Sequence, residues 1–126
     1  MGNMYLNIKK NMSFKQNLKF VICGTDTDIG KTLISSFFVR GLQSFYWKPI
    51  QSGIENETDS KSVFRLSGVR KENILREAYI FKKPVSPHWA AELDKKKIDL
   101  NLLDLPSIGG SLVIETAGGL MVPITR

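Results

Sequence analysis

The chain has 126 residues, of which 42% are hydrophobic and 24% charged, and its formal net charge is +6 at pH 7. This length and composition are typical of one globular domain with a modest core. The apolar runs are far shorter than the roughly 20 residues of a membrane-spanning helix, and Lys15 and Gln16 interrupt any secretory apolar region. We therefore expect a cytoplasmic protein with no membrane partner.

The positive charge does not indicate a nucleic-acid binder. Lysines occur in small scattered clusters, as at 9–10 and 95–97, without the interleaved aromatic residues of a single-strand binder. We expect a solvated basic surface and no nucleic-acid partner. The single cysteine, Cys23, cannot form an internal disulfide, and its apolar neighbours predict a small buried hydrophobic residue.

The first elements are a strand and a helix. Residues 1–17 are polar and rich in Asn and Lys, which predicts a disordered lead-in before a domain that begins at residue 18. The apolar run at 19–23 predicts a strand. A helix is expected over 31–42, and its apolar residues recur at helical spacing on one face. These residues are Leu33, Ile34, Phe37 and Phe38.

The rest of the chain continues the alternation of strands and helices. The expected strands are an aromatic strand from 45 ended by Pro49, a short strand at 78–81 and an apolar strand at 111–114 ending in Glu115. One helix is expected to be capped by Thr58 or Asp59 and closed by Ser67-Gly68, and a second to run from Ser86-Pro87 to about 95. A short amphipathic segment is expected at 100–105. This order predicts a doubly wound α/β fold with a mainly parallel sheet, in which ligands bind at the carboxyl ends of the strands.

The segment "GTDTDIGKT", residues 24–32, lies between the first strand and the first helix. Such a turn directs backbone N–H groups and the positive end of the helix dipole toward a phosphate. In the P-loop pattern, Lys31 would reach the outer phosphates and Thr32 would ligate Mg²⁺. Gly24 and Gly30 are separated by five residues, where the usual pattern has four, so a glycine-punctuated turn without a ligand is the alternative. The residues predicted to contact ATP are Thr27, Asp28, Ile29, Gly30, Lys31 and Thr32.

Charged residues also follow two other predicted elements. Lys48 closes the aromatic strand, where it could supply a second cation to an anionic centre or lie in solvent at the sheet edge. Glu115 closes the last apolar strand, where a P-loop NTPase places a carboxylate for Mg²⁺. Asp59 could add a second oxygen ligand or simply cap its helix.

Taken in order, five motifs resemble the dethiobiotin synthases, the ATP-dependent carboxylases of the biotin pathway. The motifs are "GTDTDIGKT", "WKPIQSG", "TDS", "VSPHWAA" and "IETAGGLMVPIT". The extra residue of the phosphate loop is part of that family's pattern, whereas Thr116 stands where the family has Gly. The resemblance covers residues 18–126 and corresponds to the N-terminal half of the family's chain, so the expected fold is a truncated P-loop NTPase-like sheet.

The resemblance implies a reaction, its cofactors and its site residues. Diaminopelargonic acid, CO₂ and ATP would give dethiobiotin through a carbamate and a carbamic-phosphoric anhydride. The implied catalytic residues are Lys31 for the γ-phosphoryl group, Lys48 for the carbamate and the moving phosphoryl group, and Ser52 for a hydrogen bond to either. The implied Mg²⁺ ligands are Thr32, Asp59 and Glu115. Gly118 and Gly119 would allow the backbone close to the substrate, and the full-length protein would be a homodimer.

Three alternatives remain from the sequence alone. A partition-type ATPase has a second Lys early in its phosphate loop, where this chain has Asp26. Cobyric and cobyrinic acid synthase-like ligases share the loop start but match the Lys48-Pro49 strand end less well. A non-catalytic remnant with a P-loop is the third. In each case we expect little activity from residues 1–126 by themselves, because the family's remaining strands and its adenine site would lie elsewhere.

Overall fold

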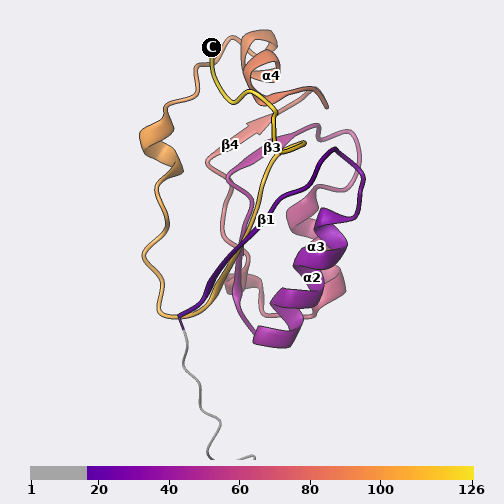
Figure 1. Cartoon of the computed structure of the whole chain (residues 1–126), viewed down its shortest axis with the longest axis vertical. Helices are drawn as coiled ribbons and strands as arrows, with labels where there is room; N and C mark the ends of the chain where they lie inside the picture. Colours follow the sequence, from indigo (N-terminus) through magenta and orange to yellow (C-terminus); the bar gives the residue numbers. More distant parts are fainter. Residues whose placement is uncertain (1–16) are drawn as a thin grey trace, which may run out of the picture.

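The computed structural model describes residues 17–126, so nearly all of the lead-in predicted at 1–17 lies outside the described residues. The central element is a parallel three-stranded sheet in the order β1-β5-β2 (Figure 1). Its strands are β1 (Lys19–Ile22), β2 (Phe45–Trp47) and β5 (Leu112–Glu115). All four residues of β5 are buried, which agrees with a continuous apolar run in the centre of a parallel sheet.

Two helices cover one face of this sheet (Figure 1). They are α2 (Lys31–Leu42) and α3 (Asp59–Ser67), which begin after Gly30 and Thr58 and end before Gln43 and Gly68. The core beneath them consists of Val39, Tyr46, Val63, Val69 and Val113. A 3-10 turn, η1 (Lys71–Asn73), leads away from α3. The predicted bounds of both helices are confirmed. Gly30 and Gly68 adopt the left-handed conformation at the start of α2 and the end of α3, and Thr58 precedes α3 in an extended conformation without a side-chain capping bond.

A second parallel sheet extends the fold beyond Pro49. It pairs β3 (Ile50–Ser52) with β4 (Tyr79–Phe81), and α4 (Pro87–Leu93) packs on it. The predicted end of the aromatic strand before Pro49 is confirmed: β2 ends at Trp47, and after Lys48-Pro49 the chain enters a different sheet. Proline lacks the N–H that would continue the first ladder.

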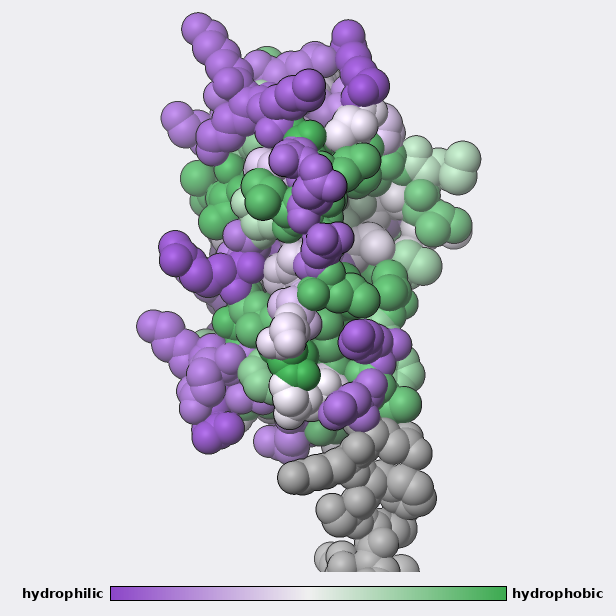
Figure 2. Space-filling model, turned by 90° about the vertical axis from the view of Figure 1, so that its left-hand side faces the viewer, coloured by the Kyte–Doolittle hydropathy of each residue, from purple (hydrophilic) through white to green (hydrophobic). Residues whose placement is uncertain are grey.

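The side of the molecule away from α2 and α3 is covered by irregular chain. The segment with η2 (Leu100–Leu103) runs along it (Figure 1), and apolar side chains are visible between charged ones on this side (Figure 2). On the same face of the sheet, Trp47, Leu112 and Ile114 form a small buried cluster. Among the described strands β1 pairs only with β5, so its other edge is open.

Burial differs from the apolar pattern at two places. Three residues of the apolar stripe of α2, Leu33, Ile34 and Phe37, are exposed, whereas Phe38 is half-buried and packs against the core. The buried residues of the helix are Lys31, Ser35, Ser36 and Val39. The rotation of α2 buries the side chain of Lys31. Ser35 and Val39, four and eight positions later, lie on the same side of the helix and are buried as well. Cys23 is exposed, because β1 ends at Ile22 and the chain turns into the phosphate loop.

Candidate functional site

The phosphate loop runs from the end of β1 to the start of α2. Gly30 caps the helix with a φ of 100°, a left-handed conformation that glycine adopts without strain. The helix then begins at Lys31, and its first N–H groups have no partner within the helix. The loop therefore has the anion-binding geometry that the spacing of "GTDTDIGKT" predicts.

Lys31 closes the loop on itself. Its side chain is only 8% exposed, and its Nζ donates a hydrogen bond to the backbone oxygen of Asp26. The ammonium is thus held across the loop at the start of α2. A lysine held in this way can contact an anion bound on the loop without a large search of rotamers.

The turn at 118–120 packs against the phosphate loop. Leu120 N donates to the oxygen of Gly24 at 2.7 Å. A Cβ on Gly119 would lie 2.6 Å from the oxygen of Thr25, which no side chain can tolerate. Gly119 therefore packs directly against the phosphate loop, and it also lines the pocket described below.

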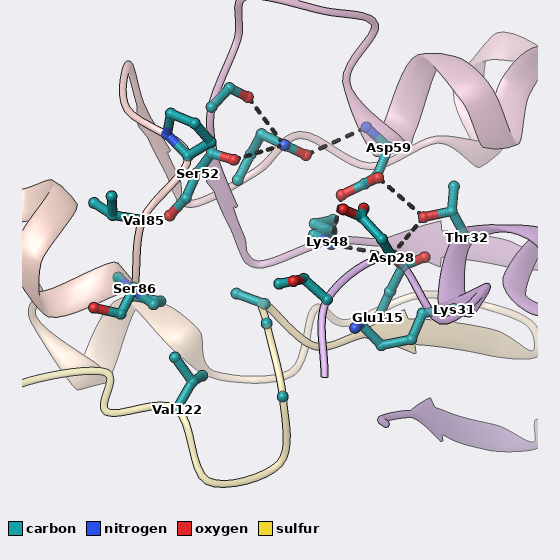
Figure 3. Close-up of a pocket in the computed structure, with 18 of the residues that line it drawn as sticks. Asp28, Lys31, Thr32, Lys48, Ser52, Asp59, Val85, Ser86, Glu115 and Val122 are labelled. Atoms are coloured by element: carbon teal, nitrogen blue, oxygen red, sulfur yellow. Dashed lines mark hydrogen bonds and ion pairs between the residues drawn. The ribbon is translucent and has the colours of Figure 1, made fainter. Parts of the chain in front are cut away.

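Three oxygen-bearing side chains meet next to Lys31. Thr32 Oγ1 lies 2.9 Å from Asp59 Oδ1 and 2.9 Å from Glu115 Oε1 (Figure 3). The hydroxyl has one proton, so it can donate to only one of the two carboxylates at a time. The hydroxyl and the two carboxylates are hard oxygen donors, the ligand type that fits Mg²⁺. Within residues 17–126 no group of three or more His, Cys, Asp or Glu forms a candidate metal site.

Lys48 supplies positive charge to this cluster. Its Nζ lies 2.6 Å from Asp59 Oδ2 and 3.0 Å from Glu115 Oε1, and it also donates to the backbone oxygen of Thr116 at 3.3 Å. The side chain is 5% exposed. The alternative of a solvent-exposed lysine at the sheet edge is thus excluded.

Tyr46 fixes the second oxygen of Glu115. Its hydroxyl donates to Glu115 Oε2 at 3.0 Å, and both residues are fully buried. Burial and the nearby carboxylates of Glu115 and Asp59 raise the pKa of Tyr46, so the phenol remains a donor at any physiological pH. The sequence motifs do not include this residue. Its spacing of two from Lys48 was the available signal, because alternate residues of a strand lie on the same face.

The phosphate loop, Lys48 and the three side chains Thr32, Asp59 and Glu115 line one pocket of about 800 Å³ (Figure 3). It contains nearly all the predicted site residues, namely Thr27, Asp28, Gly30, Lys31, Thr32, Lys48, Ser52, Asp59, Glu115, Gly118 and Gly119. The facing wall includes Val85, Ser86 and Val122. The ends of several strands and the loops that follow them therefore converge on a cavity large enough for a nucleotide polyphosphate and a small substrate.

Ser52 lies on the far wall of this pocket from the phosphate loop (Figure 3). Its Oγ is buried and has no hydrogen-bond partner among residues 17–126. Next to it, Gln51 was also missed from the sequence: it is buried, and its Oε1 accepts from the backbone N–H of Asp59 at 3.3 Å. Gln51 thus links the strand that carries Ser52 to the start of α3.

Two residues lie elsewhere than their motifs suggest. Ile29 is half-exposed and is not among the residues that line the pocket; its side chain lies over Gly24. Thr116 lines a second, apolar cavity of about 250 Å³ that shares Glu115, Ala117 and Gly119 with the first. Its Oγ1 is buried without a hydrogen-bond partner in the described part of the chain.

Residues 19–126 match a family model described as an AAA domain. Among curated relatives, the chain is similar to the ATP-dependent dethiobiotin synthetase BioD of Rhodopseudomonas palustris (strain TIE-1), with 53% identity over 86% of this chain and 51% of the relative. The proteins of that name from Agrobacterium fabrum and Brucella anthropi are 53% and 47% identical, over 86% and 87% of this chain and 51% and 52% of their own length. The chain spans about half the length of the curated relatives that it matches.

No helix within residues 17–126 is long and apolar enough to cross a membrane.

The P-loop NTPase-like α/β fold expected from the order of the elements is confirmed by the parallel sheets and the family match. The chain therefore belongs to the AAA domain family, and its resemblance to the dethiobiotin synthases is confirmed over about half the length of those relatives.

Proposed function

We propose that this chain forms the phosphate-binding and metal-binding half of an ATP-dependent dethiobiotin synthetase. One amine of diaminopelargonic acid would add to CO₂ as a carbamate, and the carbamate oxygen would take the γ-phosphoryl group of ATP. The second amine would then displace phosphate and close the cyclic urea, so the products are dethiobiotin, ADP and phosphate. The observation that carries the proposal is the meeting of Lys31, Lys48 and the Thr32–Asp59–Glu115 cluster in one pocket.

Each residue has a role that follows from its position. The N–H groups at the start of α2 and the ammonium of Lys31 would hold the β- and γ-phosphates. Thr32, Asp59 and Glu115 would hold Mg²⁺, which supplies charge neutralisation to the phosphates. The unpaired hydroxyl of Ser52 would donate to the carbamate, and Thr27 and Asp28 would shape the loop around the nucleotide.

Lys48 is the residue proposed to act on the reacting atoms. A carbamate and a transferring phosphoryl group are both anions, and they repel one another as they approach. A buried ammonium between them stabilises the charge that develops in the transition state. The proposal also includes a cytoplasmic homodimer, as expected for a soluble biosynthetic enzyme of this kind.

The test is a chimaera in which residues 18–126 replace the matching half of the Rhodopseudomonas palustris (strain TIE-1) relative. We expect phosphate release that depends on both diaminopelargonic acid and bicarbonate with Mg-ATP. The same chimaera with Lys31→Ala is the control and should release no phosphate above background. Phosphate release that does not respond to the diamine would contradict the assignment of the substrate.

A further inference from the structure

The ammonium of Lys48 has no free donor. A lysine has three N–H groups. They point to Asp59 Oδ2 at 2.6 Å, Glu115 Oε1 at 3.0 Å and the backbone oxygen of Thr116 at 3.3 Å. In this arrangement Lys48 cannot donate to a carbamate or a phosphoryl group, although it lines the pocket that would receive them.

The same two carboxylates are the proposed ligands of Mg²⁺. Asp59 and Glu115 are bridged by Thr32 on one side and by Lys48 on the other (Figure 3). Glu115 Oε1 serves both bridges, since it contacts Thr32 Oγ1 and Lys48 Nζ. A divalent cation bound to this oxygen and to Asp59 would face the ammonium at a distance where like charges repel strongly. Lys48 and the metal therefore compete for the same oxygens.

We propose that Lys48 is the tethered counter-ion of the metal-free site and that it exchanges with the divalent cation. When the metal binds, Lys48 leaves Asp59 and Glu115 and turns its N–H groups into the pocket toward Ser52. Lys48 thus becomes available to the reacting groups only after the metal is in place. The inference rests on the metal site of the proposed function and adds an order of events to it.

The structure supplies a matched control, because Lys31 is a second buried lysine of the same pocket. Its exposure is close to that of Lys48, at 8% against 5%, but its Nζ contacts the backbone oxygen of Asp26 and forms no ion pair with the two carboxylates. Loss of either ammonium removes one positive charge from the pocket. Only the loss of Lys48 also removes a competitor for the metal ligands.

The first measurement is binding of Mn²⁺, without nucleotide, to the chain and to its Lys48→Met and Lys31→Met variants, followed by the electron paramagnetic resonance signal of free Mn²⁺. We expect Lys48→Met to bind Mn²⁺ at least about 10-fold more tightly than wild type, and Lys31→Met to stay within about 3-fold. Equal tightening in both variants would indicate a general field effect and overturn the exchange. No binding of Mn²⁺ to any of the three proteins would overturn the metal site itself.

The second measurement uses wild-type protein alone, so it holds even where Lys48→Met does not fold. Lysine amines are labelled with an amine-reactive reagent, with and without Mn²⁺, and the labelled sites are quantified by mass spectrometry. We expect Mn²⁺ to increase labelling of Lys48 several-fold and to leave Lys31 unchanged. Bound Mn²⁺ with no change at Lys48 would refute the exchange while leaving the metal site intact.

Discussion

Replacement of Tyr46 by Phe tests how the carboxylate at the centre of the site is held. Phenylalanine keeps the ring, so the core among Val39, Val63 and Val113 is preserved. What disappears is the hydroxyl that donates to Glu115 Oε2 at 3.0 Å, in a place where both residues are fully buried. A buried hydrogen bond to a charged group contributes about 1.5–3 kcal/mol.

We therefore expect Tyr46→Phe to lower the free energy of unfolding by about 2 kcal/mol. For a domain of this size, this corresponds to a fall in Tm of roughly 10 °C. Because burial and neighbouring carboxylates raise the pKa of Tyr46, the phenol stays protonated and the loss should be the same at pH 7 and pH 9. We also expect Mn²⁺ to bind about 10-fold more weakly, since Glu115 loses the group that orients it.

Thermal unfolding followed by circular dichroism measures the first effect, and titration with Mn²⁺ measures the second. Tyr79→Phe is the matched control: its hydroxyl also forms hydrogen bonds, accepting from Asp99 N at 2.8 Å, but the residue is only half-buried and does not line the pocket. The control should lose less than about 1 kcal/mol and bind Mn²⁺ normally. An unchanged Tm together with unchanged Mn²⁺ affinity in Tyr46→Phe would refute the reasoning.

Three further predictions concern the phosphate loop and the reacting groups. Lys31→Ala should abolish binding of Mg-ATP in a calorimetric titration, and unchanged affinity would contradict the P-loop assignment. Gly119→Ala should lower the Tm by several degrees, because its Cβ would collide with Thr25, whereas Gly109→Ala, with open space around it, should not. In the chimaera, Lys48→Gln should reduce kcat about 10²- to 10³-fold with little change in KM for ATP; normal turnover would rule out its proposed role.

The order of the elements could be predicted because its signals are local. Gly30 and Thr58 precede the first residues of α2 and α3, and Gly68 follows the last residue of α3. Each is a residue type that favours a helix terminus. The second sheet that the chain enters after Pro49 could not be predicted in the same way. Whether the chain after Pro49 continues one ladder or enters another depends on where residues 79–81 lie, and this is a tertiary choice.

In the site, likewise, residues within local sequence motifs could be predicted, whereas contacts between residues far apart in the sequence could not. The phosphate loop and Glu115 were predicted from motifs next to apolar strands. The hydrogen bond from Tyr46 to Glu115 was not, because the two residues are 69 positions apart and the strand pattern marks Tyr46 as core. The buried face of α2 could not be read from the spacing for a related reason. Amphipathic spacing identifies an apolar face, but the position of Lys31 in the pocket sets the rotation of the helix.

The open edge of β1 has a consequence for the behaviour of the chain in solution. Its outer row of peptide groups faces no other strand of residues 17–126, and Val21 on this strand is exposed, as is Phe37 on α2. Such an edge is a template for strand addition, and exposed Lys19 and the net charge of +6 are what oppose contact between copies. Salt screens this repulsion and leaves the apolar attraction in place. Added salt therefore favours self-association of the chain over the dispersed state.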